Sequence, residues 1–339
     1  MGCGGSTAGG GGSGGGSASG SKKVSVDLKG KGTSSLSGVK TSVQELDVSE
    51  NSSLASLDGV GALVKLEKLD ANSCGLTTVP AEIANCQALE ELLLFANKIK
   101  ELPKELGQLT SLTTINVFNN QVKKMPPECG TLANLEEVNC AANKMMMLTD
   151  AHFTAWANVK ILSLYDNNLV RMGSLAPLES LEELRISGNN LEEMPTLSSH
   201  KHLSVYEIHK NRIASIPDDY FTATPALQRL SVWGNMLTAL PPSLTGLQGL
   251  VGVQAQDNKI QTLPAGTWPK KLETLFLQNN PVSSLPASLG DDCKSLKRVN
   301  LTKLTLDGPA LEVAGKIQSQ CLSDKDGIFW GTDGKRLGA

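Results

Sequence analysis

The stretch LEELLLFANKIKELP, residues 89–103, sets the pattern that the rest of the chain repeats. Its apolar residues, one asparagine and the closing proline occupy the frame L-x-x-L-x-L-x-x-N-x-L-x-x-L-P. The frame recurs with its first position at Val43, Leu66, Leu89, Leu112, Leu135, Val159, Leu181, Leu203, Leu227, Leu250, Leu272 and Leu296. Successive first positions are 22 to 24 residues apart, and a period of that length indicates an array of structural repeats.

The repeat predicts a leucine-rich repeat solenoid of the α/β class. Within each unit the segment L-x-L predicts a short strand whose leucines point inward, followed by a turn and an irregular or short helical return path. One unit cannot bury its apolar face alone, so neighbouring units must stack. We therefore expect a curved horseshoe of about twelve repeats, with a parallel sheet on its concave face.

An asparagine column supports this interpretation. Ten of the twelve repeats carry Asn at the same position of the frame: Asn51, Asn97, Asn120, Asn143, Asn167, Asn189, Asn211, Asn235, Asn258 and Asn280. A buried amide there can bridge backbone groups of the turn that would otherwise lack a hydrogen-bond partner. Cys74 and Leu304 replace the asparagine in the remaining two repeats.

The array divides the chain into four parts. These are a disordered Gly/Ser-rich tail at 1–23, an N-terminal cap or degenerate repeat at 24–42, the array at 43–306, and a C-terminal cap helix with a tail at 307–339. Val24, Val26 and Leu28 alternate with polar residues, which favours a first strand. Asp307 as an N-cap and Pro309 in the first turn favour a helix after the last repeat.

Composition limits the classes of protein that the chain can belong to. The formal net charge is -3 and hydrophobic residues make up 40% of the sequence, so nothing favours general attraction to nucleic acid. No apolar run approaches the roughly 20 residues of a membrane span, and the N-terminus lacks the apolar core of a secretory signal. Seven scattered cysteines without a C-x-x-C motif predict reduced thiols. We expect a cytoplasmic protein.

The outward positions of the predicted sheet hold the candidate binding residues. Although aromatic residues are only 4% of the chain, several fall on this face. The predicted partner-binding residues are Leu93, Phe95, Phe118, Tyr165, His209, Trp233 and Phe276. Exposed aromatics are typical of interface hot spots, although side chains stacked along a parallel sheet also stabilise one another. The same face is acidic over the first five repeats and basic over the last five, which would orient a partner.

Motifs for chemistry are missing from the sequence. There is no phosphate-binding G-x-x-x-x-G-K-[ST] loop, no G-x-S-x-G and no kinase signature set. Three of the four histidines cluster at 200–209, but the frame places them on different sides of a repeat. We therefore expect no enzyme activity, no cofactor, no metal site, no nucleic-acid partner and a monomeric chain.

The first six residues, MGCGGS, match the N-myristoylation pattern M-G-x-x-x-[ST]. Gly2 would accept the myristoyl chain, and palmitoylation of Cys3 would supply the second signal that stable anchoring needs. The Gly/Ser-rich tail would then be a flexible tether to the membrane. The alternative is a glycine-rich tail that matches the pattern by chance.

With proline after the last leucine and a mean period near 23, the repeats resemble those of intracellular leucine-rich-repeat proteins of the Ras-group and Ras-suppressor kind. The resemblance implies a scaffold in signalling that binds another protein through its concave face, such as a small GTPase or a phosphatase subunit. We expect it at the cytoplasmic face of a membrane. The alternative is a soluble regulatory or targeting subunit of a phosphatase or ubiquitin ligase.

Overall fold

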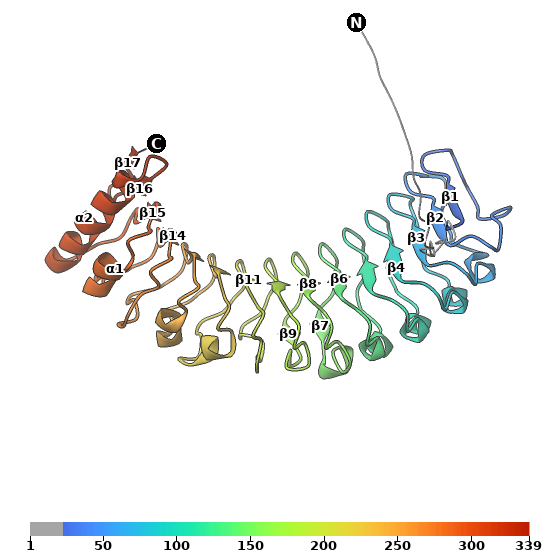
Figure 1. The fold of residues 1–339 in the computed structure, drawn as a ribbon, viewed down its shortest axis with the longest axis horizontal. Coiled ribbons are helices and arrows are strands. Elements are labelled where there is room, and N and C mark those ends of the chain that lie inside the picture. Colours follow the sequence, from blue (N-terminus) through green and yellow to red (C-terminus); the bar gives the residue numbers. More distant parts are fainter. Residues whose placement is uncertain (1–22, 339) are drawn as a thin grey trace, which may run out of the picture.

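The computed structural model describes residues 23–338, which form one curved solenoid (Figure 1). Within these residues a 15-stranded sheet lines the concave side from β1 (Ser25–Asp27) to β17 (Arg336–Gly338). Every neighbouring pair of strands is parallel except the last, β16 (Ile328–Trp330) with β17. The predicted lipidation residues, Gly2 and Cys3, lie outside the described residues.

The twelve predicted strands are all present, so the leucine-rich repeat solenoid is confirmed. They are β2 (Glu45–Asp47), β3 (Lys68–Asp70), β4 (Glu91–Leu93), β5 (Thr114–Asn116), β6 (Glu137–Asn139), β8 (Ile161–Ser163), β10 (Glu183–Arg185), β11 (Val205–Glu207), β12 (Arg229–Ser231), β13 (Gly252–Gln254), β14 (Thr274–Phe276) and β15 (Arg298–Asn300). Equivalent positions pair in register, as Leu69 with Leu92 and Leu92 with Ile115. The central residue of each strand is buried and the first points outward, which leaves one face of the sheet open.

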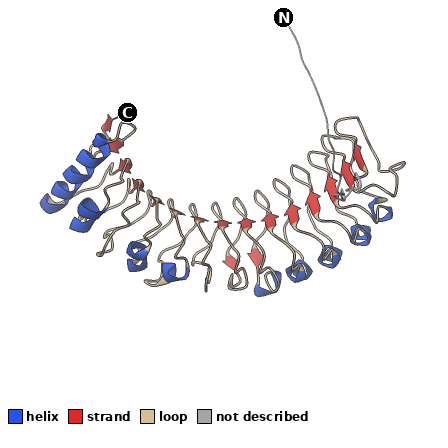
Figure 2. Cartoon of the chain, in the orientation of Figure 1, coloured by secondary structure: helices blue, strands red, loops and turns tan. Residues whose placement is uncertain are grey.

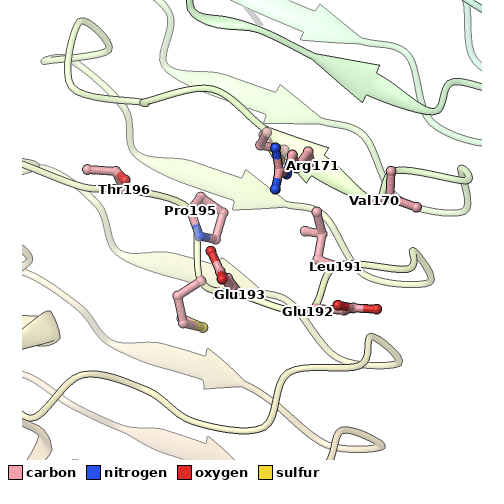
Figure 3. Close-up of a pocket in the computed structure, with 9 residues that line it drawn as sticks. Val170, Arg171, Leu191, Glu192, Glu193, Pro195 and Thr196 are labelled. Atoms are coloured by element: carbon pink, nitrogen blue, oxygen red, sulfur yellow. The ribbon is translucent and has the colours of Figure 1, made fainter.

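The convex side is built mainly from short 3₁₀ helices (Figure 2). They are η1 (Val60–Ala62), η2 (Ala81–Asn85), η3 (Lys104–Gln108), η4 (Pro127–Thr131), η5 (Asp150–His152), η6 (Tyr220–Ala223) and η7 (Pro242–Gly246), followed by the α-helix α1 (Ala287–Asp292). Two further strands, β7 (Met147–Leu148) and β9 (Arg171–Met172), pair in parallel away from the main sheet. A pocket of about 150 Å³ lies beside β9 (Figure 3).

The asparagine column is buried, as the frame predicts. Asn143 Nδ2 donates to the carbonyls of Val117, at 2.9 Å, and Cys140, at 3.1 Å, while its Oδ1 accepts from the Val122 amide at 2.8 Å. All ten column asparagines are at least nine-tenths buried. Each amide therefore connects the turn of its own repeat to the repeat before it.

Both ends of the array carry additional structure. β1 continues the sheet at the N-terminal end, with Val26 opposite Leu46. At the other end α2 (Gly308–Ser323) packs against α1, and the Asp307 carboxylate accepts from the Ala310 amide at 2.8 Å. The predicted tail after this helix is wrong in part, because β16 and β17 extend the sheet beyond it. The frame ends before this segment, whose place in the sheet is shown by the pairing of β16 with β15, with Phe329 opposite Val299.

Candidate functional site on the concave face

The predicted binding residues lie on the concave sheet, in two columns. Leu93 and Phe276 are the last residues of β4 and β14. Phe95, Phe118, Tyr165, His209 and Trp233 each lie two residues beyond the end of a strand. Phe95 is 36% exposed and the other six are partly buried. Their role in binding stays a prediction.

The structure brings four of these residues together as two ring pairs and pairs Phe276 with a further ring, whereas Leu93 and Phe95 belong to no ring pair among residues 23–338. The ring centroids of Phe118 and Tyr165 are 6.0 Å apart, and those of His209 and Trp233 are 4.6 Å apart. Phe276 meets Trp330 edge-on at 6.3 Å. Trp330 could not be predicted from the repeat frame, because it lies in β16 beyond the last recognisable repeat.

The Trp233 indole contacts neighbouring side chains of its own chain. Its plane is within 11° of the His209 imidazole, and Lys210 Nζ lies 4.8 Å from the indole centroid. The Ser231 hydroxyl is 3.1 Å from His209 Nδ1. Burial lowers the pKa of His209, and the positive charge of Lys210 lowers it further. The stack therefore presents two nearly parallel rings beside the positive charge of Lys210.

A depression of about 210 Å³ lies beside this stack on the same face. Its floor includes Gly252, the first residue of β13, where the absence of a side chain leaves room. Its lining is Glu207, His209, Arg229, Leu230, Ser231, Val251, Gly252, Gln254 and Thr274. A ligand side chain that entered it would meet one carboxylate, one guanidinium and several neutral hydrogen-bonding groups.

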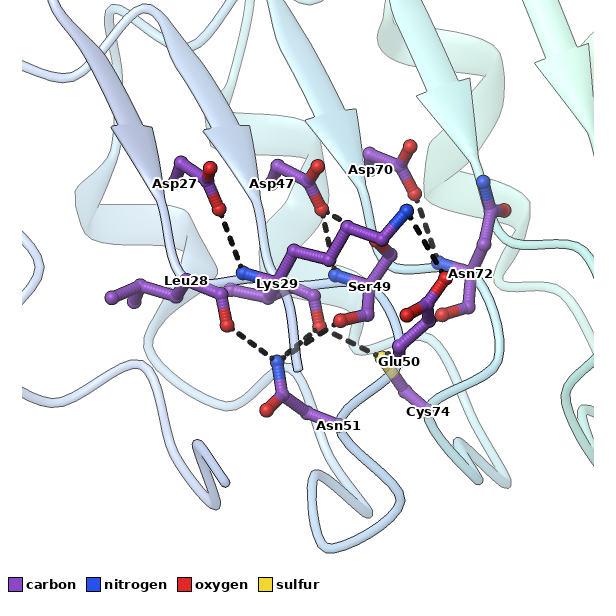
Figure 4. Close-up of polar contacts among 11 residues, drawn as sticks. Asp27, Leu28, Lys29, Asp47, Ser49, Glu50, Asn51, Asp70, Asn72 and Cys74 are labelled. Carbon is purple, nitrogen blue, oxygen red and sulfur yellow. Dashed lines mark hydrogen bonds and ion pairs between the residues drawn. The ribbon is translucent and has the colours of Figure 1, made fainter. Parts of the chain in front are cut away.

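The first strands of the concave face carry a row of carboxylates (Figure 4). Asp27, Asp47 and Asp70 occupy the same position of adjacent strands. Each accepts a hydrogen bond from the backbone amide two residues on, as Asp70 does from Asn72 at 3.1 Å. Burial raises the pKa of Asp70, and the neighbouring Asp47 charge acts in the same direction. Within residues 23–338 no group of acidic, histidine or cysteine side chains is arranged to hold a metal ion.

Cations at the two ends of this face differ in whether they form ion pairs with described residues. Near the N-terminal end Lys23 pairs with Glu67 at 2.8 Å and Lys29 with Glu50 at 3.0 Å. Near the C-terminal end, Arg229, Arg298 and Lys303 have no ion pair with any described residue. The basic half of the concave face therefore keeps positive charge that no ion pair within residues 23–338 neutralises.

These features define a class of protein: a repeat scaffold that presents one long, open sheet with fixed rings and unbalanced charge. The chain belongs to the leucine-rich repeat family, because the family model described as "Leucine-rich repeat region" matches residues 37–218, more than half of the sequence. Within residues 23–338 no helix is long and apolar enough to cross a membrane.

Similar proteins show how far the likeness extends. Lumican of Gallus gallus is 30% identical over 174 residues, which cover 49% of this chain and 49% of lumican. Osteomodulin of Bos taurus is 31% identical over 142 residues, covering 41% of this chain and 32% of osteomodulin. The solved structure of an internalin from Listeria monocytogenes superposes with a TM-score of 0.61 at 18% identity, covering 76% of this chain and 80% of that one. The matches thus span about half the length of lumican and less of osteomodulin, and the internalin likeness is one of fold. The Ras-group resemblance stays a prediction.

Proposed function

We propose that this chain is a non-enzymatic interaction scaffold that binds a protein partner through its concave face. The observation that carries the proposal is the coexistence, on one side of the sheet, of fixed ring pairs and of cations without carboxylate partners. The core of the solenoid lies on the opposite side of the strands, so this face is not needed to bury it. Its side chains are free to contact another molecule.

The Trp233 stack and the neighbouring depression are the best-supported contact region. Tryptophan and arginine are enriched at interface hot spots. Here Arg229 lines the depression, and Trp233 stacks on His209, which is another of its lining residues. Because His209 already fixes the indole, less side-chain entropy is lost when a partner binds. Trp233 therefore offers apolar area and Arg229 offers charge at one place.

Partner capture with matched variants tests this proposal. Full-length wild type, Trp233→Ala and Gly252→Leu are immobilised and exposed to the same cell extract, and bound proteins are identified by mass spectrometry. A Cβ at Gly252 would lie 3.8 Å from the Thr274 Cβ, an ordinary contact, so a side chain there fills the depression without displacing the backbone. We expect the affinity of a specific partner to fall roughly 30-fold in Trp233→Ala, which corresponds to about 2 kcal/mol.

Val64→Ala is the matched control, because Val64 is 54% exposed but lies between η1 and β3, away from the concave face. It should capture the same proteins as wild type. If all variants capture the same proteins with the same affinity, the concave face is not the binding surface.

We propose further that the scaffold acts in signalling, with a small GTPase or phosphatase subunit as partner, and is lipid-anchored at the cytoplasmic face of a membrane. The support is the MGCGGS start and the Ras-group resemblance of the repeats. Cell fractionation should find wild type in the membrane fraction, Cys3→Ser divided between fractions and Gly2→Ala soluble. An intact mass without acylation at Gly2 would instead favour the soluble regulatory or targeting subunit.

A further inference from the structure

One lateral side of the horseshoe carries an ordered strip of exposed side chains. In each repeat two residues lie between the last two core positions of N-x-L-x-x-L, and both point to solvent. In four successive repeats these pairs are Lys123–Lys124, Met146–Met147, Val170–Arg171 and Glu192–Glu193, and all eight residues are exposed. We call this set the lateral strip; it runs from two basic residues, through a centre of three apolar residues and Arg171, to two acidic residues.

Three apolar side chains at the centre of the lateral strip are more than half exposed to solvent. Met146 is 61% exposed, Met147 54% and Val170 51%. They lie next to one another, because the Val170 amide donates to the Met146 carbonyl at 3.0 Å and β7 pairs with β9. A contiguous exposed apolar patch with a polar rim is typical of an interaction surface.

The flanks of the lateral strip carry charges that the chain does not neutralise. Lys123, Lys124, Glu192 and Glu193 form no ion pair with any residue in 23–338. Elsewhere the chain does pair charges between adjacent repeats, as with Lys160 and Glu136 at 2.6 Å. In the lateral strip two repeats separate Lys123 and Lys124 from Glu192 and Glu193, so these charges cannot meet within one molecule. Arg171 lies one repeat before the two glutamates, beside the same pocket, and forms no ion pair with either of them.

This arrangement is self-complementary. A two-fold axis that lies in the surface of the strip, across its long direction and through the middle of its apolar centre, brings two copies face to face. It exchanges the first pair with the fourth and the second with the third, and keeps the order within each pair. Lys123 then meets Glu192 of a second copy, Lys124 meets Glu193 of that copy, and Met146 meets its Val170. An isologous interface requires this kind of pattern. An anionic membrane surface fits less well, because it would repel Glu192 and Glu193.

We propose that the lateral strip is the interface of a two-fold symmetric homodimer. The proposal is independent of the concave-face function, since it leaves Trp233 and the depression open to a partner. The strip spans only four repeats, whereas stable interfaces bury about 800 Å² on each partner. We therefore expect weak association that decreases with added salt, because salt screens exposed charge pairs. The expectation of a monomer from sequence is replaced by this proposal.

Sedimentation velocity of the full chain tests the proposal at low ionic strength. Concentrations should span about a hundredfold range up to roughly 100 µM, which covers the micromolar affinity of a small interface. Wild type should shift from monomer to dimer across this range. The variants Lys123→Glu/Lys124→Glu and Glu192→Lys/Glu193→Lys should each remain monomeric, because each places like charges opposite one another.

An equimolar mixture of the two variants is the decisive sample. In the mixed dimer both flanks again pair opposite charges, so the mixture should dimerise while neither variant does so alone. Lys270→Glu/Lys271→Glu carries the same charge change at exposed lysines outside the strip and should dimerise like wild type. Unchanged melting temperatures show that all variants fold. A monomeric wild type, a dimer that survives both reversals, or a mixture that stays monomeric would each overturn the proposal.

Discussion

The Nε2 atom of His200 lies 3.1 Å from the carbonyl oxygen of Leu175, 25 residues earlier in the chain, and so connects two neighbouring repeats through the core. The His200 side chain is fully buried, and its Nδ1 atom has no hydrogen-bond partner among the described residues. A proton on Nδ1 would place a charge where no acceptor stabilises it.

Because of this contact, we expect the free energy of unfolding to decrease as the pH is lowered. Burial lowers the pKa of His200 below its ordinary value of 6.5. Near and below pH 6.5 the unfolded chain therefore binds a proton that the folded chain does not. The free energy of unfolding contributed by this group is complete above pH 6.5 and decreases as the pH falls below it. Urea unfolding at pH 7.5 and pH 5.5 should show a smaller difference for His200→Asn than for wild type. The control His202→Asn alters an exposed imidazole and should keep the wild-type difference.

Replacing one column asparagine should show how much the amide ladder stabilises the array. Asn143→Ala leaves the Val122 amide buried without a partner, while the Val117 and Cys140 carbonyls each keep one donor, from Asn120 and Asn167. We expect it to lower the free energy of unfolding by about 1 to 3 kcal/mol. Asn168→Ala, at an exposed asparagine of the next repeat, should change it by less than about 0.5 kcal/mol. Equal losses for the two variants in chemical denaturation would contradict the register of the array.

Because the outer 3₁₀ helices pack closely, we expect a side chain at Gly130 to lower the stability of the fold. A Cβ at Gly130, in η4, would lie 1.9 Å from the Ala151 carbonyl oxygen, so the backbone of the next repeat would have to move. Gly130→Ala should destabilise the chain by about 1 to 3 kcal/mol through overpacking. At Gly246, in η7, a Cβ meets nothing within 4 Å. Thermal unfolding should therefore find Gly246→Ala close to wild type, and a similar melting temperature for both variants would argue against this tight contact.

The six described cysteines should be inert while the chain is folded. All six are buried, and burial raises the pKa of Cys129 and of Cys140 to about 12. Because the thiolate is the reactive form, a disulfide reagent at pH 8 should modify these six thiols only after denaturant is added. Rapid modification of more than one of the seven thiols in native protein would show that the array opens locally.

The sequence predicts the strands and the asparagine column because both depend on local periodicity. A leucine such as Leu92 is buried whenever its repeat stacks, whatever the rest of the chain does. The ring pairs could not be derived in this way, since the approach of His209 to Trp233 depends on how two repeats lie relative to each other. Trp330 was missed because its strand lies beyond the last frame.

The lateral strip was also hidden in the sequence, although its residues occupy fixed positions of the frame. Lysines and glutamates at such positions are ordinary on a solvated surface, and only the structure shows whether they pair. The absence of ion pairs at Lys124 and Glu192 within residues 23–338 is what distinguishes them from the paired Lys160.

The reversal of direction at β17 has a consequence for how copies of the chain can join end to end. A solenoid whose two outermost strands ran the same way could add a second copy in register at its end, and repeated additions of that head-to-tail kind produce an open filament. Here the exposed edge at one end is the parallel strand β1, and at the other it is the antiparallel strand β17. A copy added head to tail in the orientation of the main sheet would place its β1 antiparallel to β17, so the hairpin of β16 and β17 prevents such a copy from continuing the parallel register of the array.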